Sequence, residues 1–301
     1  MTVAAIAVTA AFPLSTALAV IGAGMLHASW NAMAKAITDR RAFFVLFGVS
    51  SAVCGAIGAV FAAVPARSAW PWLATSCVLH VVYSALLVRS YHLGDFNQVY
   101  PLARGTAPLL VAVVATVVIG DRMTVPELCG VAVICAGLAL LALVRPAIRD
   151  PRGQHSPVRQ PRGRAIGAAV LTGVSIAAYT ISDGLGVRAS GTSVGYASWL
   201  FLLSGPLIAG WAISRQARET WAAARVSLAP GVTGGVLGVA AYGIVLWAQT
   251  TGALAVVAAL RETGVITGAV IGVAVFRERA AASRIVAAVT VAAGAALINL
   301  H

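Results

Sequence analysis

Charged residues are scarce in this chain. Only 10% of its 301 residues are charged, and only nine are Asp or Glu. Soluble domains carry about 25% charged residues, so these are too few to cover a globular surface in water. Hydrophobic residues make up 60% of the chain, and its mean hydropathy is +0.91. This composition excludes an ordinary soluble protein and predicts an integral membrane protein.

Sequence motifs for metal or nucleotide chemistry are missing as well. The chain has no His-Glu-x-x-His pair, no cluster of aspartates and no phosphate-binding glycine loop that ends in lysine. Its four cysteines, at 54, 77, 129 and 135, lie inside apolar stretches without metal-ligand spacing. We therefore expect no enzyme activity, no metal and no cofactor. The missing nucleotide loop also argues against a nucleotide-driven pump.

Long apolar stretches dominate the sequence instead. Each is close to the roughly 20 residues that a helix needs to cross a bilayer, and none shows the alternating polarity of a membrane β-barrel. We expect an all-α integral membrane protein with ten transmembrane helices. The predicted spans are 15–37, 42–64, 70–92, 98–120, 125–145, 164–187, 194–214, 230–251, 254–276 and 281–300.

The last five spans repeat the pattern of the first five. Pairs separated by 157 residues are Arg104 with Arg261, Thr106 with Thr263, Asp121 with Glu278, and Gly137 with Gly294. Two tandem copies of an odd number of spans must lie in opposite orientations, an arrangement typical of secondary transporters. We therefore expect two inverted five-helix repeats, at 1–145 and 164–301. A polar linker rich in proline and arginine, 146–163, joins them.

The excess positive charge follows the links between the spans. The links after the odd-numbered spans hold fifteen of the twenty arginines, whereas the links after spans 2, 4 and 6 hold one each. Arginine concentrates on the cytoplasmic side of membrane proteins. The net charge of +12 thus indicates topology and not a nucleic-acid partner. It predicts a cytoplasmic linker and outward-facing termini in a multi-pass protein of a bacterial-type inner (plasma) membrane.

Two stretches carry a family resemblance. The segment 99–108, Val-Tyr-Pro-Leu-Ala-Arg-Gly-Thr-Ala-Pro, with the Gly-Asp-Arg turn at 120–122, resembles the fourth-span signature of the EamA family of the drug/metabolite transporter superfamily. The segment 26–35, Leu-His-Ala-Ser-Trp-Asn-Ala-Met-Ala-Lys, is similar to the first span of one branch. In the second copy of the turn, Arg277 replaces the glycine.

The resemblance implies ten helices in two inverted repeats, with a central cavity lined mainly by helices 1, 3, 4, 6, 8 and 9. Members of the family move amino acids, nucleosides, sugars and other metabolites, so the substrate stays open. They usually place both termini in the cytoplasm, opposite to the orientation that the arginine distribution predicts.

Ionisable residues within the apolar spans are the leading site candidates, because such residues are costly in a membrane and are usually retained for function. Arg104 in span 4, and Arg261 with Glu262 in span 9, lie far from the span ends. The forked guanidinium groups suit an anionic group such as a carboxylate. The alternative is structural: either arginine could pair with Glu262 or Asp183 and lock helices together.

Polar and aromatic residues of other spans complete the predicted lining. His27 and Asn31 lie on one face of span 1, and Asp183 lies near the end of span 6, where a solvated helix cap is the alternative to function. The remaining substrate-binding candidates are Trp30, Tyr83, Tyr100, Tyr179 and Tyr242. The groups that could carry a proton are His27, His80, Asp183 and Glu262.

These features predict a secondary transporter, most simply an exporter, of a small polar metabolite such as an amino acid or related organic anion. It would work by alternating access, coupled to a proton or a counter-solute, as a monomer or homodimer in the lipid bilayer. The alternative is a lipid-carrier flippase or a membrane-embedded enzyme that acts on a phosphate headgroup.

Overall fold

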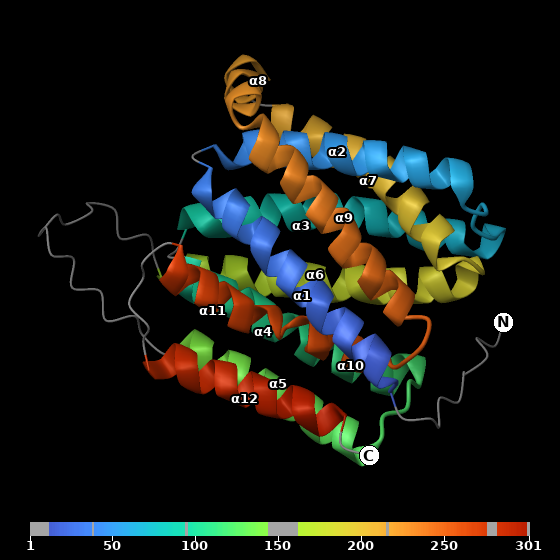
Figure 1. The fold of residues 1–301 in the computed structure, drawn as a ribbon, viewed down its shortest axis with the longest axis vertical. Helices are drawn as coiled ribbons and strands as arrows, with labels where there is room; N and C mark the ends of the chain where they lie inside the picture. Colours follow the sequence, from blue (N-terminus) through green and yellow to red (C-terminus); the bar gives the residue numbers. More distant parts are fainter. Residues whose placement is uncertain are drawn as a thin grey trace, which may run out of the picture.

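The computed structural model describes residues 12–37, 39–93, 96–143, 162–214, 217–275 and 282–299. Within these ranges every regular element is a helix, as Figure 1 shows. The elements are α1 (Leu14–Ala36), α2 (Arg40–Phe61), η1 (Arg67–Ala69), α3 (Trp70–Leu93), α4 (Phe96–Val114), η2 (Ala115–Ile119), α5 (Val125–Leu143), α6 (Arg162–Ser190), α7 (Ser193–Ile213), α8 (Ala217–Val226), α9 (Leu228–Ala248), α10 (Leu254–Arg261), α11 (Gly264–Ala274) and α12 (Ala282–Ile298).

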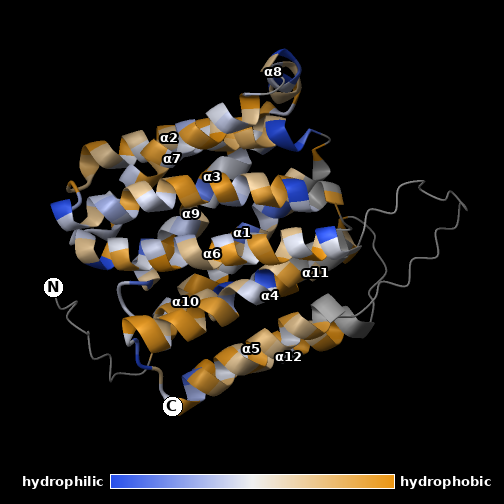
Figure 2. Ribbon diagram, turned by 180° about the vertical axis from the view of Figure 1, so that it is seen from behind, coloured by the Kyte–Doolittle hydropathy of each residue, from blue (hydrophilic) through white to orange (hydrophobic). Residues whose placement is uncertain are grey.

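The helices are long and apolar enough for a multi-pass membrane protein. Eight segments reach the length and hydropathy of a membrane span, the last of them running through α10 into α11. The apolar parts of α5 and α12 are shorter, at Val125–Leu140 and Ile285–Ile298. Hydrophobic colour covers much of the outside of the bundle in Figure 2, most continuously along α5, α10 and α12. The predicted all-helical class is confirmed for the described residues, and their helices have the length and composition of membrane spans.

Three helices differ from the predicted spans. The ninth span is broken between α10 and α11, where the backbone N–H groups of residues 262, 263, 265 and 266 bond carbonyls three positions earlier instead of four. The sixth helix continues to Ser190, three residues beyond the predicted end. The short helix α8 lies in the link between the predicted spans 194–214 and 230–251. Hydropathy alone could not locate the break, because residues 254–271 together are apolar enough for one membrane span.

Close helix pairs form the edges of the bundle. In Figure 1, α2 and α7 lie side by side at one edge, α5 and α12 lie at the opposite edge, and α1 packs beside α9 between them. Glycine permits these approaches: a Cβ added at Gly48 of α2 would stand 2.5 Å from the carbonyl oxygen of Gly205 in α7. A Cβ at Gly130 of α5 would stand 2.6 Å from the carbonyl oxygen of Gly294 in α12. Small residues at such contacts let membrane helices associate.

The α2–α7 contact supplies a stability prediction. We expect Gly205→Ala to lower the thermal unfolding midpoint in detergent by several degrees, because its new Cβ would overlap the Gly48 carbonyl oxygen and the Ala52 backbone nitrogen. Gly210→Ala in the same helix is the matched control. A Cβ there meets nothing within 4 Å, so the midpoint should hold or rise slightly. Equal effects of the two changes would contradict the close packing.

Candidate functional site

A charged cluster lies inside the bundle where α1, α4 and the α10–α11 break meet. Arg104 Nε lies 2.6 Å from Glu262 Oε2, and Arg104 Nη1 lies 2.9 Å from His27 Nε2. Arg104 and Glu262 are both buried. A guanidinium can only donate hydrogen bonds, so Nε2 of His27 must accept and the ring must be neutral in this arrangement. The structure thus gives Arg104 a carboxylate and an imidazole partner.

Arg261 is placed differently, although it is equally buried at 2% exposure. It ends α10, and its Nε lies 3.7 Å from Glu262 Oε1, too far for a hydrogen bond. Among the described residues, no acceptor forms a hydrogen bond with this Nε. Two arginines therefore share one carboxylate among the described residues, which leaves one positive charge in excess and an open Nε donor on Arg261. Such a site favours an anionic group.

Helix α1 lies directly against the break that carries these groups. A Cβ at Gly24 would stand 2.8 Å from the carbonyl oxygen of Arg261 and 3.0 Å from the nitrogen of Gly264. One turn further along α1, the rings of His27 and Trp30 meet edge to face at 4.9 Å. The buried Trp30 Nε1 has no acceptor among the described residues, so a second open donor lies beside the cluster.

Four predicted residues form an aromatic group next to the charges. The Tyr179 ring centroid lies 4.4 Å from that of His80, 5.5 Å from that of Tyr83 and 5.8 Å from that of Tyr242. These residues come from α3, α6 and α9. The structure therefore brings together aromatic residues from spans as far apart in the sequence as the third and the eighth.

Asp183 lies beside this aromatic group and makes no ion pair among the described residues. Tyr196 donates its hydroxyl to Asp183 Oδ1 at 3.0 Å, and Tyr242 donates to Oδ2 at 2.6 Å. Asp183 is 0% exposed because α6 continues past it for two turns. The alternative of a solvated helix cap is therefore wrong. Tyr196, in the first turn of α7, was not predicted, and no sequence signal linked it to Asp183.

Two other predictions fare differently. The Asn31 side chain donates to the His27 carbonyl of its own helix at 2.8 Å, which satisfies part of its hydrogen-bonding capacity locally. Tyr100 belongs to α4, but its side chain lies outside the described part of the structure. Of the ten predicted substrate-binding residues, the other eight lie in or directly beside the charged and aromatic groups.

Comparison with known proteins identifies the fold alone. No family model matches the chain, and no curated protein matches it. Twenty-seven solved chains do match in structure. One crystal structure superposes with a TM-score of 0.68 over 95% of this chain and 98% of its own length, at 17% sequence identity. The whole helical arrangement therefore has a counterpart of nearly equal extent.

Proposed function

We propose that the chain is a secondary transporter of a small metabolite with an anionic group, such as an amino acid or related organic anion. The observation that carries the proposal is Arg261, a buried guanidinium whose Nε has no hydrogen-bond partner among the described residues, at a break in a membrane-length helix. Discontinuous helices with charged groups near the middle of a bundle are typical binding elements of secondary transporters. The aromatic group of His80, Tyr83, Tyr179 and Tyr242 lies next to these charges and would contact the rest of the solute.

The contacts between helices support inverted repeats. Two inverted repeats would match α1 with α6, α2 with α7, α3 with α9, α4 with α10–α11, and α5 with α12. Each contact between two helices should then recur between their two counterparts. The pair α3–α6 then corresponds to α9–α1, and α4–α6 to α11–α1. Gly24 and Gly173 have the same sequence separation as Trp30 and Tyr179, and each packs against the backbone beside a buried arginine, Arg261 or Arg104.

Membership of the EamA family belongs to the same proposal. It is supported by the fourth-span signature around Arg104 and by the pseudo-symmetric pairing of helices. Ten membrane crossings would follow if α5 and α12 also span the bilayer. Transport would proceed by alternating access in a bacterial-type plasma membrane, coupled to a proton or a counter-solute.

Ligand-dependent thermal stability tests the function directly. The purified protein in detergent would be heated with carboxylates, amino acids, phosphonates, nucleosides, neutral sugars or phospholipid headgroups. A solute at 100 times its Kd stabilises by about 2.7 kcal/mol, so we expect an anionic solute to raise the unfolding midpoint by several degrees. Exchange of the same solute across proteoliposome membranes would then establish transport. Stabilisation by neutral sugars or by phospholipid alone would contradict the proposal.

A further inference from the structure

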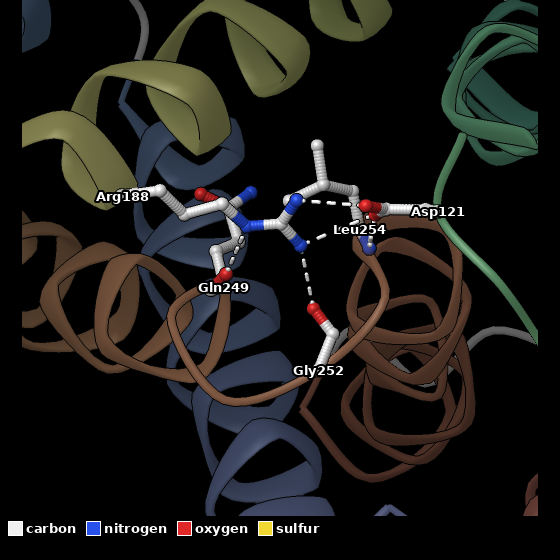
Figure 3. A network of polar contacts seen from close by, with 5 residues as sticks. All are labelled: Asp121, Arg188, Gln249, Gly252 and Leu254. Atoms are coloured by element: carbon white, nitrogen blue, oxygen red, sulfur yellow. Dashed lines mark hydrogen bonds and ion pairs between the residues drawn. The ribbon is translucent and has the colours of Figure 1, made fainter. Parts of the chain in front are cut away.

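Arg188, near the end of α6, binds two separate segments of the chain: Asp121, and the link between α9 and α10. Its Nη1 and Nη2 donate to the two carboxylate oxygens of Asp121 at 2.8 and 3.1 Å. Its Nε donates to the Gln249 carbonyl at 2.9 Å, and Nη2 donates also to the Gly252 carbonyl at 2.8 Å. Figure 3 shows the guanidinium between these groups. A forked, two-point pair of this kind fixes geometry as well as charge.

Asp121 makes a further bond that links this network to α10. Its Oδ2 accepts from the backbone N–H of Leu254, the first residue of α10, at 2.9 Å. A carboxylate at this position satisfies an otherwise unpaired N–H and complements the positive end of the helix. Asp121 follows α4 in the first half of the chain, whereas Arg188 and α10 belong to the second half. The network therefore joins the halves.

The same helix connects the network to the anion site. All eight residues of α10, Leu254 to Arg261, are buried. Arg261 is its last residue, about 10 Å from Leu254 at the rise of an α-helix. A two-turn helix packed on all sides moves as a rigid unit, so its position at one end determines where Arg261 lies at the other.

We propose that Asp121 and Arg188 form an ionic latch that closes the end of the bundle where α6 ends and α10 begins. The latch also fixes the position of α10, and therefore the position of Arg261. The inference rests on the proposed function, since it assigns one step of alternating access. Both side chains are partly solvated, at 13% and 18% exposure, so water can reach and separate the pair when the halves move apart. In Figure 1, the link from α9 to α10 lies at one end of the bundle, and α3 and α11 end at the other.

Cysteine accessibility tests the latch without any solute. Two buried threonines on α6, about two helical turns apart, serve as reporter positions. Thr180→Cys lies near the latch, because the Thr180 carbonyl accepts from the Gln249 side chain, and Thr172→Cys lies further from it. Each would be placed in a chain whose four native cysteines are replaced by alanine. The rate of modification by a small charged methanethiosulfonate would be measured on the purified protein in detergent, with and without Arg188→Gln.

We expect Arg188→Gln to raise the labelling rate at Thr180→Cys at least tenfold and to leave the rate at Thr172→Cys unchanged or lower. Asp121→Asn should act in the same way. Asparagine can still accept from Leu254 N–H, so this variant removes the ion pair while keeping the helix cap. The Asn variant also serves if Arg188→Gln does not fold.

An unchanged rate at Thr180→Cys in both variants would overturn the latch, and so would an equal rise at both reporters, which indicates general loosening. The transporter proposal would survive either result as long as anionic solutes stabilise the parent protein. Conversely, a selective rise at Thr180→Cys without any anion stabilisation would support the latch as a closure of this end and reject the anion site.

Discussion

Arg261→Lys is expected to lower transport of an anionic solute at least tenfold while the yield of folded protein stays near that of the parent. Lysine keeps the positive charge but replaces a planar fork with a single ammonium group, which cannot bind a carboxylate at two points. The fold should tolerate the change, because Arg261 Nε has no hydrogen bond to lose among the described residues. Proteoliposome exchange measures the transport rate, and size-exclusion chromatography measures the folded yield.

Arg218→Lys is the matched control, since Arg218 is exposed on the short helix α8. It makes the same chemical change away from the site and should alter neither quantity. If Arg261→Lys transports at the parental rate, Arg261 does not bind the anion. If Arg104→Lys alone loses transport, the roles of the two arginines are reversed.

Arg104→Ala should have the largest effect on stability. Removing one partner of a buried ion pair leaves the other charge uncompensated and costs about 3–5 kcal/mol. Glu262 would lose its 2.6 Å partner, and Arg261 at 3.7 Å could replace it only in part. We expect a marked drop in the unfolding midpoint and in the folded yield. Adding Glu262→Gln should recover much of both, because it removes the unpaired charge.

The comparison variant is Arg261→Ala with and without Glu262→Gln. Arg261 lies beyond hydrogen-bonding distance of Glu262, so its loss should cost less, and Glu262→Gln should give no rescue. Rescue of Arg261→Ala, with Arg104→Ala folding normally, would show that the neighbours in sequence form the structural pair instead.

The two arginines illustrate how far the sequence leads. A charged residue within a long apolar run is conspicuous, so Arg104, Arg261 and Glu262 could be singled out without coordinates. The structural alternative named either arginine as a partner of Glu262, and the sequence could not decide between the two. Adjacent residues on a helix do not face each other, and the structure pairs Glu262 with an arginine from another helix, 158 positions earlier in the chain.

Asp183 shows a second limit. Asp183 lies close to the predicted end of span 6, which suggested a solvent-exposed carboxylate. The span was ended there because hydropathy falls where Ser, Asp and Arg enter the helix. The structure continues α6 to Ser190 and surrounds the carboxylate with Tyr196 and Tyr242. Helix continuation there depends on neighbours that pack around the polar turn, which are not local in sequence.

The sequence by itself determined the helical membrane class and the positions of the buried charges. Both follow from the local cost of placing polar groups in hydrocarbon, which each stretch of chain carries independently. The tertiary structure alone decided that α10 ends at Arg261, that Asp121 caps α10, and that Arg188 joins the two halves. Asp121 and Arg188 are 67 residues apart. They are in contact because helices from both halves of the chain end at the same side of the bundle. No local sequence pattern predicts that contact.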